Sequence, residues 1–336
     1  MADEVSELRE RVRGANARMK AGLGREQRRE RMEALRRLAI LDPRAAREVA
    51  LGAEETPGGE YMERYSQYRG AVEVTVEDRA GYSVYEYRYQ EAESGEWVTA
   101  RMDGREAVSA GSGAKMALRT LRFGDRAVVV SAELLERALV ADPACPTVGE
   151  QGVAVILVNL PGQEPLPFTA AEARELVFGE NGATLQRFLG ENSDGKMRLK
   201  GEVFGPYTLT GSIACDLSPV GLPAMAAAQR EASLAGFNRI IVIGGNDVNA
   251  CGFSGKSTIG CVLFPAAQGG MKASLQYVVV GRGQRDYSEG GLFRTDLLNV
   301  MHHEFGHGLG LQHGKLLVYN GEALGLGRAE AVIHEY

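Results

Sequence analysis

The chain has 336 residues, of which 44% are hydrophobic and 24% charged, and these are ordinary proportions for a globular protein. Its length predicts two domains and is ample for a packed core. The net charge of −6 excludes a whole-chain attraction to nucleic acid or to an anionic membrane, and no apolar run reaches the roughly eighteen residues that a membrane span needs.

The first part of the chain, residues 1–52, is charged and is predicted to be helical. Apolar residues recur at three-residue spacing over Arg25–Leu41, and the basic residues of this stretch are interpreted as a solvated helix face rather than a nucleic-acid patch. Asp42 and Pro43 predict the N-cap and first turn of a short helix that ends at Gly52. The polar start MADEVSELRERVRG is not a secretory signal, so we expect that the protein stays inside or that a signal lies outside this chain.

Residues 61–140 are predicted to form a small antiparallel β domain, either a sandwich or a barrel. Short alternating runs such as AVEVTVED are separated by turns that contain glycine. The run GYSVYEYRYQ places Tyr85, Tyr87 and Tyr89 on one face of a strand, where they are expected to pack in the sheet. The stretch holds no histidine or cysteine, and its sequence indicates no catalytic constellation.

From residue 151 onward the pattern changes to alternating strands and helices. Three continuous apolar runs are typical of strands that are buried on both faces: Val153–Leu160, Arg239–Gly245 and Leu275–Gly281. Thr169 and Glu172 form a predicted capping box. Further predicted segments are helices at Leu185–Leu189, Pro223–Ala235 and Thr295–Gly308, and an extended stretch at Met197–Leu209.

The stretch HHEFGHGLGLQHG, from His302 to Gly314, holds four of the five histidines of the chain. Residues i and i+4 share one face of a helix, so the imidazoles of His303 and His307 could bind one metal ion. Glu304 is rotated by about 100° and can face the cleft beside the metal without binding it. By the same rotation His302 is expected to point away, in a surface or supporting role.

The helix is expected to stop at Gly310, which can adopt the left-handed conformation. The chain then turns and can bring His313 to the same metal ion. Three neutral imidazole nitrogens leave the fourth tetrahedral position for water, which is the pattern of a catalytic zinc site. His303, His307 and His313 are therefore the predicted zinc ligands.

This HExxHxxGxxH motif resembles the first half of the metzincin signature. Within that clan the chain looks most like the gametolysin family and its bacterial relatives, through three further segments: VAVILVNLPGQ followed by TAAEARELVFG, NSDGKMRLKGEVFGPYTL, and RIIVIGGNDVNACGFSG. The resemblance covers about Gln151 to the end. The first 150 residues match only in architecture, as a propeptide-like region.

The sequence pattern and the resemblance together predict a mixed α+β protein. N-terminal helices (1–52) and a small antiparallel β domain (61–140) would precede a metzincin-like α/β catalytic domain (151–336). That domain would have a twisted, mostly parallel sheet and a zinc-binding active-site helix. No methionine follows Met301 to form the methionine turn, and the chain ends in VIHEY. We therefore expect a chain truncated at its C-terminus before that turn, the alternative being a natural protein that lacks it.

The implied activity is zinc-dependent hydrolysis of peptide bonds in a protein or peptide substrate, with Glu304 as general base. Leu275–Gly281 is the candidate edge strand for an extended substrate, and an ordinary core strand is an equal alternative. The resemblance also implies a secreted protein, and we expect a monomer. Two alternatives stay open: a decayed or non-enzymatic metal-binding adhesion module, and a zinc hydrolase with a non-peptide substrate.

Four cysteines lie at positions 145, 215, 251 and 261, and the lack of a CxxC pair argues against a thiolate zinc site. Cys215 and Cys251 are expected to form a disulfide, with Cys261 as an alternative partner of either. Cys145 is the candidate for a switch in which the propeptide-like region masks the cleft and the thiolate takes the water position on zinc. The alternative is a disulfide between Cys145 and the cysteine left over.

Overall fold

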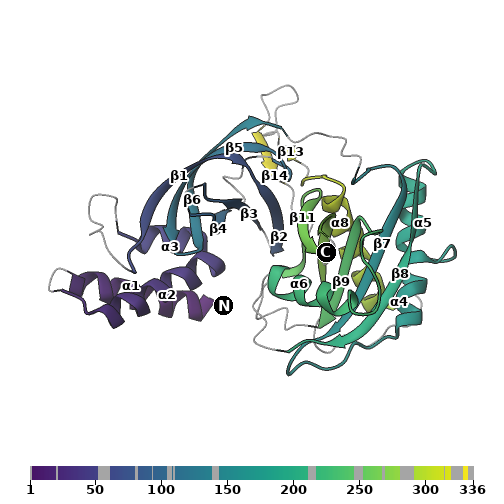
Figure 1. Ribbon diagram of the computed structural model, residues 1–336, viewed down its shortest axis with the longest axis horizontal. Coiled ribbons are helices and arrows are strands. Elements are labelled where there is room, and N and C mark those ends of the chain that lie inside the picture. The colour runs from purple at the N-terminus through teal and green to yellow at the C-terminus, as the bar shows by residue number, and fades with distance from the viewer. Residues whose placement is uncertain are drawn as a thin grey trace. The chain divides into compact units, whose positions relative to one another are not determined.

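A computed structural model gives the fold (Figure 1). It describes residues 2–19, 22–51, 61–79, 82–92, 94–103, 108, 110–137, 144–210, 217–245, 253–266, 269–280, 291–313, 315–318 and 328–331. The chain divides into two compact units. The first consists of Met1–Thr75 and Val84–Ala138, and the second of Val76–Ser83 and Leu139–Tyr336.

The first unit begins with three helices, α1 (Ala2–Met19), α2 (Arg25–Leu41) and α3 (Pro43–Val49). The predicted cap of α3 is confirmed, because the side chain of Asp42 accepts a hydrogen bond from the backbone N–H of Ala45 at 2.9 Å. The apolar stripe of α2 is buried in the core of this unit. The helix is not solvated all round: Arg31 is fully buried and forms an ion pair with Glu63 at 2.5 Å.

The sheet of the first unit follows the order β1-β5-β6-β4-β3-β2. Its strands are β1 (Arg64–Ala71), β2 (Glu73–Arg79), β3 (Tyr82–Gln90), β4 (Trp97–Asp103), β5 (Lys115–Phe123) and β6 (Arg126–Glu136). The pairs β1·β5, β5·β6 and β3·β4 are antiparallel, and β4·β6 is parallel. Tyr85, Tyr87 and Tyr89 of β3 are buried, as their alternation predicts.

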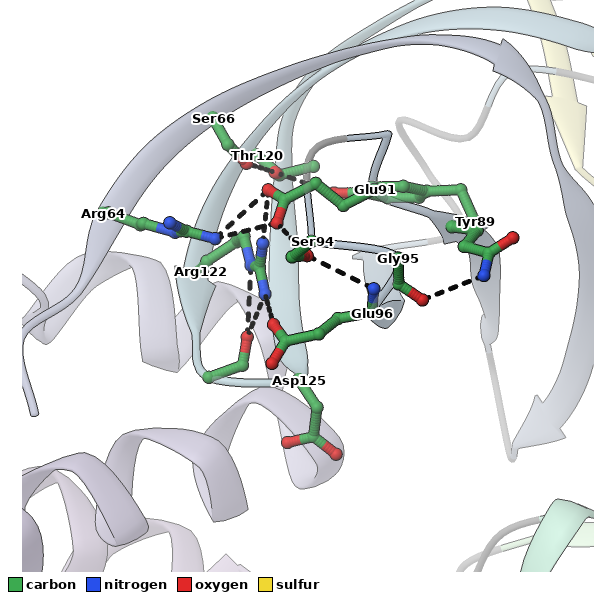
Figure 2. Close-up of polar contacts among 12 residues, drawn as sticks. Arg64, Ser66, Tyr89, Glu91, Ser94, Gly95, Glu96, Thr120, Arg122 and Asp125 are labelled. Carbon is green, nitrogen blue, oxygen red and sulfur yellow. Dashed lines mark hydrogen bonds and ion pairs between the residues drawn. The ribbon is translucent and has the colours of Figure 1, made fainter.

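A polar network fixes the turn between β3 and β4 (Figure 2). The guanidinium of Arg122 donates to Glu91 at 2.5 Å and to the carbonyl of Gly124 at 2.9 Å. Glu91 also accepts hydrogen bonds from Arg64 at 3.1 Å and from Ser94 at 2.7 Å. The hydrogen bond from Arg122, followed by that from Ser94, lowers the pKa of Glu91. These contacts connect three strands at one end of the sheet.

The second unit has a parallel core of four strands in the order β12-β9-β7-β8. They are β7 (Gly149–Asn159), β8 (Met197–Thr208), β9 (Arg239–Gly245) and β12 (Gly269–Val280), while β10 (Phe253–Thr258) and β11 (Val262–Ala266) pair antiparallel with β12. A separate two-stranded sheet contains β13 (Lys315–Val318) and β14 (Arg328–Ala331).

Alternate residues of β7 and β9 face two different cores, which explains their continuous apolar sequences. Val155 and Ile241 pack with α4 (Ala170–Phe178), α5 (Leu185–Asn192) and α8 (Leu292–Gly308). Ile156 and Val242 pack with α6 (Leu217–Ala228) on the other face. The capping box of α4 is present, with Thr169 and Glu172 in the predicted roles. None of the helices that the structure describes is long and apolar enough to cross a membrane.

The architecture is mixed α+β, as the sequence indicates, but the sheet as a whole is mostly antiparallel, and the mostly parallel arrangement predicted for residues 151–336 is limited to the four strands β12-β9-β7-β8. Six of the ten strand pairs with a described register are antiparallel: β1·β5, β5·β6, β3·β4, β10·β12, β11·β12 and β13·β14. A continuous apolar run indicates burial on both faces, and it does not specify the direction in which a neighbouring strand runs.

The helix predicted at Pro223–Ala235 also lies elsewhere. It begins at Leu217 and ends at Ala228, so that Pro223 is inside it. Proline in a helix interior removes one backbone hydrogen bond. Burial of Leu217, Val220 and Ala224 against the sheet offsets that loss.

Candidate metal centre

Helix α8, which carries the histidine motif, is packed against the sheet of the second unit. Leu297, Leu298, Met301 and Phe305 are buried against the sheet of the second unit. The helix ends at Gly308, and Gly310 has the expected left-handed conformation with φ of 94°. The backbone N–H of Leu311 donates to the carbonyl of Gly306 at 3.0 Å, which closes the end of the helix and turns the chain.

The turn brings the three predicted ligands together. The Nε2 atom of His303 lies 3.0 Å from Nε2 of His307 and 3.2 Å from Nε2 of His313. His307 is buried, and the other two side chains are only slightly exposed. Three imidazole nitrogens therefore converge on one point.

A fourth side chain, Asp78 from β2, lies at the same point. Its carboxylate oxygens are 2.7 Å from Nε2 of His303, 2.9 Å from Nε2 of His313 and 3.4 Å from Nε2 of His307. Asp78 belongs to the segment Val76–Ser83, which is part of the second unit although the flanking residues are part of the first. The four side chains offer ligand atoms within 4.8 Å of one another, and such a group could hold a metal ion.

Asp78 is not among the predicted site residues, although the sequence holds one signal for it. The run AVEVTVED alternates with Val72, Val74 and Val76 on one face, and all three are buried. Asp78 is the next residue on that face, where the alternation calls for another apolar side chain. A carboxylate at a buried position needs a partner, so the break in the pattern was itself an indication of a site.

Two contacts orient the imidazoles. The Nδ1 atom of His307 lies 2.9 Å from the carbonyl oxygen of Leu311, so a proton on Nδ1 would leave Nε2 free to face the cluster. Ser83 Oγ lies 3.3 Å from Nδ1 of His313 and donates to Asp78 at 2.9 Å. The segment that supplies Asp78 thus also contacts one of the histidines.

The electrostatics of the cluster favour a charged Asp78 and a neutral His307. Burial by itself raises the pKa of Asp78, but hydrogen bonds with the three histidines outweigh it and hold that pKa well below its usual range. Burial lowers the pKa of His307, although Asp78 opposes this effect. A neutral imidazole and an ionised carboxylate are the forms that bind metal ions.

Glu304, the predicted base, lies beside the cluster and is not one of its four members. Its side chain is buried, and its Oε2 atom has no hydrogen-bond partner among the described residues. Burial, and then the nearby charge of Asp78, raise the pKa of Glu304 well above that of an ordinary carboxyl. The carboxylate fits against Gly255 of β10, where an added Cβ would lie 2.2 Å from Oε1.

His302 points away from the cluster, as expected from its rotation on the helix. Its ring stacks on that of Phe188 from α5, with centroids 3.7 Å apart. Burial lowers the pKa of His302 to about 4. This histidine therefore contributes packing between two helices.

The cysteine hypotheses have different outcomes. Cys145 forms a disulfide with Cys261, so the disulfide alternative is confirmed for it and its sulfur is not available as a metal ligand. Nη1 of Arg239 contacts both sulfurs and donates to the carbonyl of Gly308, which links the disulfide to the end of α8. Cys215, Cys251 and the C-terminal VIHEY (332–336) lie outside the described residues.

The structure also gives the position of the candidate substrate strand in the sheet. β12, which contains most of Leu275–Gly281, lies between β10 and β9 and is an interior strand. It has neighbours on both sides and offers no free edge to a substrate. The alternative interpretation, an ordinary core strand, is the correct one.

A comparison with protein-family models finds no match to this chain, and no curated protein matches it.

Proposed function

We propose that the protein is a zinc-dependent endopeptidase. The observation that carries the proposal is the convergence of His303, His307 and His313 through their Nε2 atoms, with the buried Glu304 beside them. Two nitrogens bound to one tetrahedral zinc ion at about 2.0–2.1 Å would be separated by roughly 3.3–3.4 Å. The separations of 3.0 and 3.2 Å come close to that value.

The donor set favours zinc among the common metal ions. Imidazole suits zinc and its neighbours in the first transition row, whereas calcium and magnesium prefer oxygen ligands. When bound, zinc would lower the pKa of water and polarise a substrate carbonyl. Glu304 would then accept a proton at its carboxylate and deliver it to the leaving amine.

The environment of Glu304 supports that role. A general base works best when its pKa lies near the working pH, and the burial of Glu304 moves its pKa in that direction. Its Oε2 atom, which lacks a partner among the described residues, is free to take up a proton. A purely structural site would have no use for such a carboxylate.

One observation favours a second candidate, a non-enzymatic metal-binding module. With Asp78 the site has four protein ligands, and a closed four-ligand set is typical of structural zinc. In that case loss of Asp78 would only weaken metal binding. The two candidates thus differ in what the Asp78→Ala variant does.

The test uses the zinc-reconstituted full chain, its Asp78→Ala variant, and the double variant Asp78→Ala with Glu304→Gln. Casein hydrolysis is followed with and without a chelator, and zinc content is measured in parallel. We expect casein cleavage that the chelator abolishes. Adding Glu304→Gln to Asp78→Ala should lower the rate of cleavage by about 100-fold or more at unchanged zinc content. His303→Ala should lose zinc. A chain that binds zinc but never cleaves casein would favour the binding module.

We also propose that the protein works outside the reducing cytosol. The Cys145–Cys261 disulfide supports this, because disulfides persist in oxidising compartments. Mass mapping of protein taken directly from its native source, with free thiols blocked at lysis, tests the proposal. Reduced Cys145 and Cys261 would contradict it.

A further inference from the structure

Arg239, on β9, is a fully buried cation that contacts no carboxylate in the part of the chain that the structure describes. Its Nε donates to the side chain of Gln151 at 3.1 Å, and its Nη2 donates to the carbonyl of Pro146 at 2.6 Å. Nη1 donates to the carbonyl of Gly308 at 3.1 Å and contacts both sulfurs of the disulfide. A buried charge is costly unless other groups compensate it, so the surroundings of Arg239 must supply that compensation.

The C-terminal end of α8 supplies negative charge at this point. The last carbonyls of a helix have no partner within it, and the helix dipole gives this end a partial charge of about −0.5. Gly308 is the last residue of α8, and its carbonyl is the one that Arg239 binds. The carbonyl of His307, just before it, accepts a hydrogen bond from the N–H of Gly260 at 2.8 Å. Groups from outside the helix therefore fix its end.

The same end of α8 lies close to the sheet. A Cβ atom added to Gly308 would lie 2.7 Å from Oγ of Ser274 and 2.7 Å from Nε2 of Gln276, two fully buried residues of β12. Ser274 is the cross-strand neighbour of Arg239 in the parallel pair β9·β12. Gly308 is thus held over these two strands by a hydrogen bond at its carbonyl and by close contact at its Cα.

The position of this helix end determines where two of the three histidines lie. His307 directly precedes Gly308, and its carbonyl also accepts the N–H of Gly310 at 2.8 Å, in the turn that leads to His313. The Nε2 atoms of both histidines must stay close to that of His303 if the three are to share one ion. Metal ligands need to be held within about 0.5 Å of their productive geometry, so even a small shift of the helix end would weaken metal binding.

We propose that Arg239 is a positioning residue of the metal centre. Its guanidinium ties the carbonyl of Gly308 to Pro146 and Gln151, and the tied helix end holds the last two histidines of the motif where they can share one metal ion. This inference rests on the proposed zinc function and adds a residue that acts on the metal through the helix, without touching it. Arginine suits this task because its fork of donors reaches several acceptors from one side chain and always carries its charge.

The test uses full-length chains. Zinc affinity is measured by competition with a chelator, and the visible spectrum of the Co²⁺-loaded chain reports the geometry of the site, with casein hydrolysis followed in parallel. Arg239→Met removes the charge and the donors, whereas Arg239→Lys keeps the charge and replaces the fork by a single nitrogen. Gly308→Ala displaces the helix end through its added Cβ and leaves Arg239 unaltered.

Two control variants match these changes. Cys145→Ser breaks the disulfide beside Arg239 and lowers stability, while the serine hydroxyl can still accept a hydrogen bond from Nη1. Gly306→Ala adds a Cβ to the same helix two positions earlier, where the nearest atom belongs to Leu311 at 3.6 Å. An effect of lowered stability alone would appear in the first control, and an effect of any methyl group added to α8 would appear in the second.

We expect Arg239→Met and Gly308→Ala to weaken zinc binding by about tenfold or more and to change the Co²⁺ spectrum, because groups that orient metal ligands contribute that much to affinity. Arg239→Lys should weaken zinc binding by about threefold, since one nitrogen cannot reach all the acceptors of the fork. Both controls should keep the zinc affinity and the Co²⁺ spectrum of the wild type.

The outcomes separate this proposal from the peptidase function. Wild-type zinc affinity and spectrum in Arg239→Met or in Gly308→Ala would overturn the positioning role, as would an equal loss in Cys145→Ser. If Arg239→Met fails to fold, Arg239→Lys takes its place, and unchanged zinc binding in that variant overturns the role. Weaker zinc binding in the Arg239 and Gly308 variants, without casein cleavage by any chain, would support the role and count against the peptidase. Casein cleavage by every chain at equal zinc affinity would support the peptidase and overturn the role.

Discussion

At the scale of single residues, the surroundings shift the pKa values of two side chains at the centre in opposite directions. Burial lowers the pKa of His307 and raises that of Glu304. These opposite directions follow from one cause, because a buried site disfavours the charged form of each group. The imidazole is thereby kept neutral for metal binding, and the carboxyl is moved toward the range of a general base.

Gly255 is predicted to position Glu304. An added Cβ would lie 2.2 Å from Oε1 and 2.7 Å from Cδ of that residue, so Gly255→Ala must displace the carboxylate. In the Asp78→Ala background we expect casein hydrolysis to fall by about tenfold or more while zinc content stays the same.

Gly236→Ala is the matched control, since nothing lies within 4 Å of its added Cβ. Both variants are compared by initial rates of casein cleavage and by metal analysis. Wild-type rates for Gly255→Ala would show that the activity does not need Glu304 in this position.

At the scale of elements, the end of α8 decides whether the third histidine reaches the other two. Gly306 lies inside the helix, and an added Cβ would make only ordinary contact with Leu311 at 3.6 Å. Gly310 lies past the helix end with φ of 94°. A Cβ atom is therefore tolerated at Gly306, whereas the backbone conformation of Gly310 strains any residue that has one.

We predict opposite effects of alanine at these positions. Gly306→Ala should stabilise the second unit by up to about 1 kcal/mol, because alanine forms helix better than glycine. Gly310→Ala should destabilise it by about 1–2 kcal/mol, because its left-handed backbone strains any residue with a Cβ. Thermal unfolding of the metal-free chains measures both effects. Equal shifts in the same direction would contradict the assigned helix end.

The ion pair between α2 and the residue before β1 gives the first unit a predicted pH dependence. Burial alone would raise the pKa of Glu63, but hydrogen bonds and charge from Arg31 outweigh it and lower that pKa below its ordinary value of 4.5. A lowered folded-state pKa gives stability that is present above the unfolded pKa and lost as pH falls through the folded one. Glu63→Gln removes this contribution.

We expect the stability gap between the wild type and Glu63→Gln to be about 3–5 kcal/mol near pH 7 and to narrow as pH falls below about 4.5. Trp97, the single tryptophan of the chain, lies on β4 in the first unit, so its fluorescence in urea titrations reports the unfolding of that unit. A gap that widens on acidification would refute the assigned ion pair.

At the scale of the whole molecule, the side chains of the candidate metal centre come from distant parts of the sequence. Asp78 and His303 are separated by 225 positions, yet they lie in one compact unit. The segment Val76–Ser83 continues at both ends into the other unit.

The disulfide is predicted to stabilise the second unit and to have no inhibitory role. Cys145 and Cys261 are 116 positions apart, so the bond restricts a long loop of the unfolded chain. Cys145→Ser should lower the unfolding free energy by about 2–4 kcal/mol. It should leave the casein hydrolysis of the full-length chain unchanged, measured below the unfolding transition. Increased hydrolysis by Cys145→Ser would point to a thiol switch instead.

The local features of this protein could be predicted from its sequence. The spacing of His303, His307 and His313 is a property of helix geometry, and Gly310 stops the helix because it lacks a Cβ. The caps at Asp42 and Thr169 follow from hydrogen bonds within three residues. Such interactions depend on neighbours in the chain, so the order of residues alone determines them.

The remaining features were decided by contacts between distant segments. The direction of β10, the interior place of β12 and the pairing of Cys145 with Cys261 depend on which strands meet in the folded sheet. In the sequence, Asp78 is marked only by the break that it makes in the alternation of apolar residues along its strand. Its partners are histidines more than two hundred positions away, and no local rule connects them. Only the tertiary structure brings its carboxylate to the point where the three imidazoles converge.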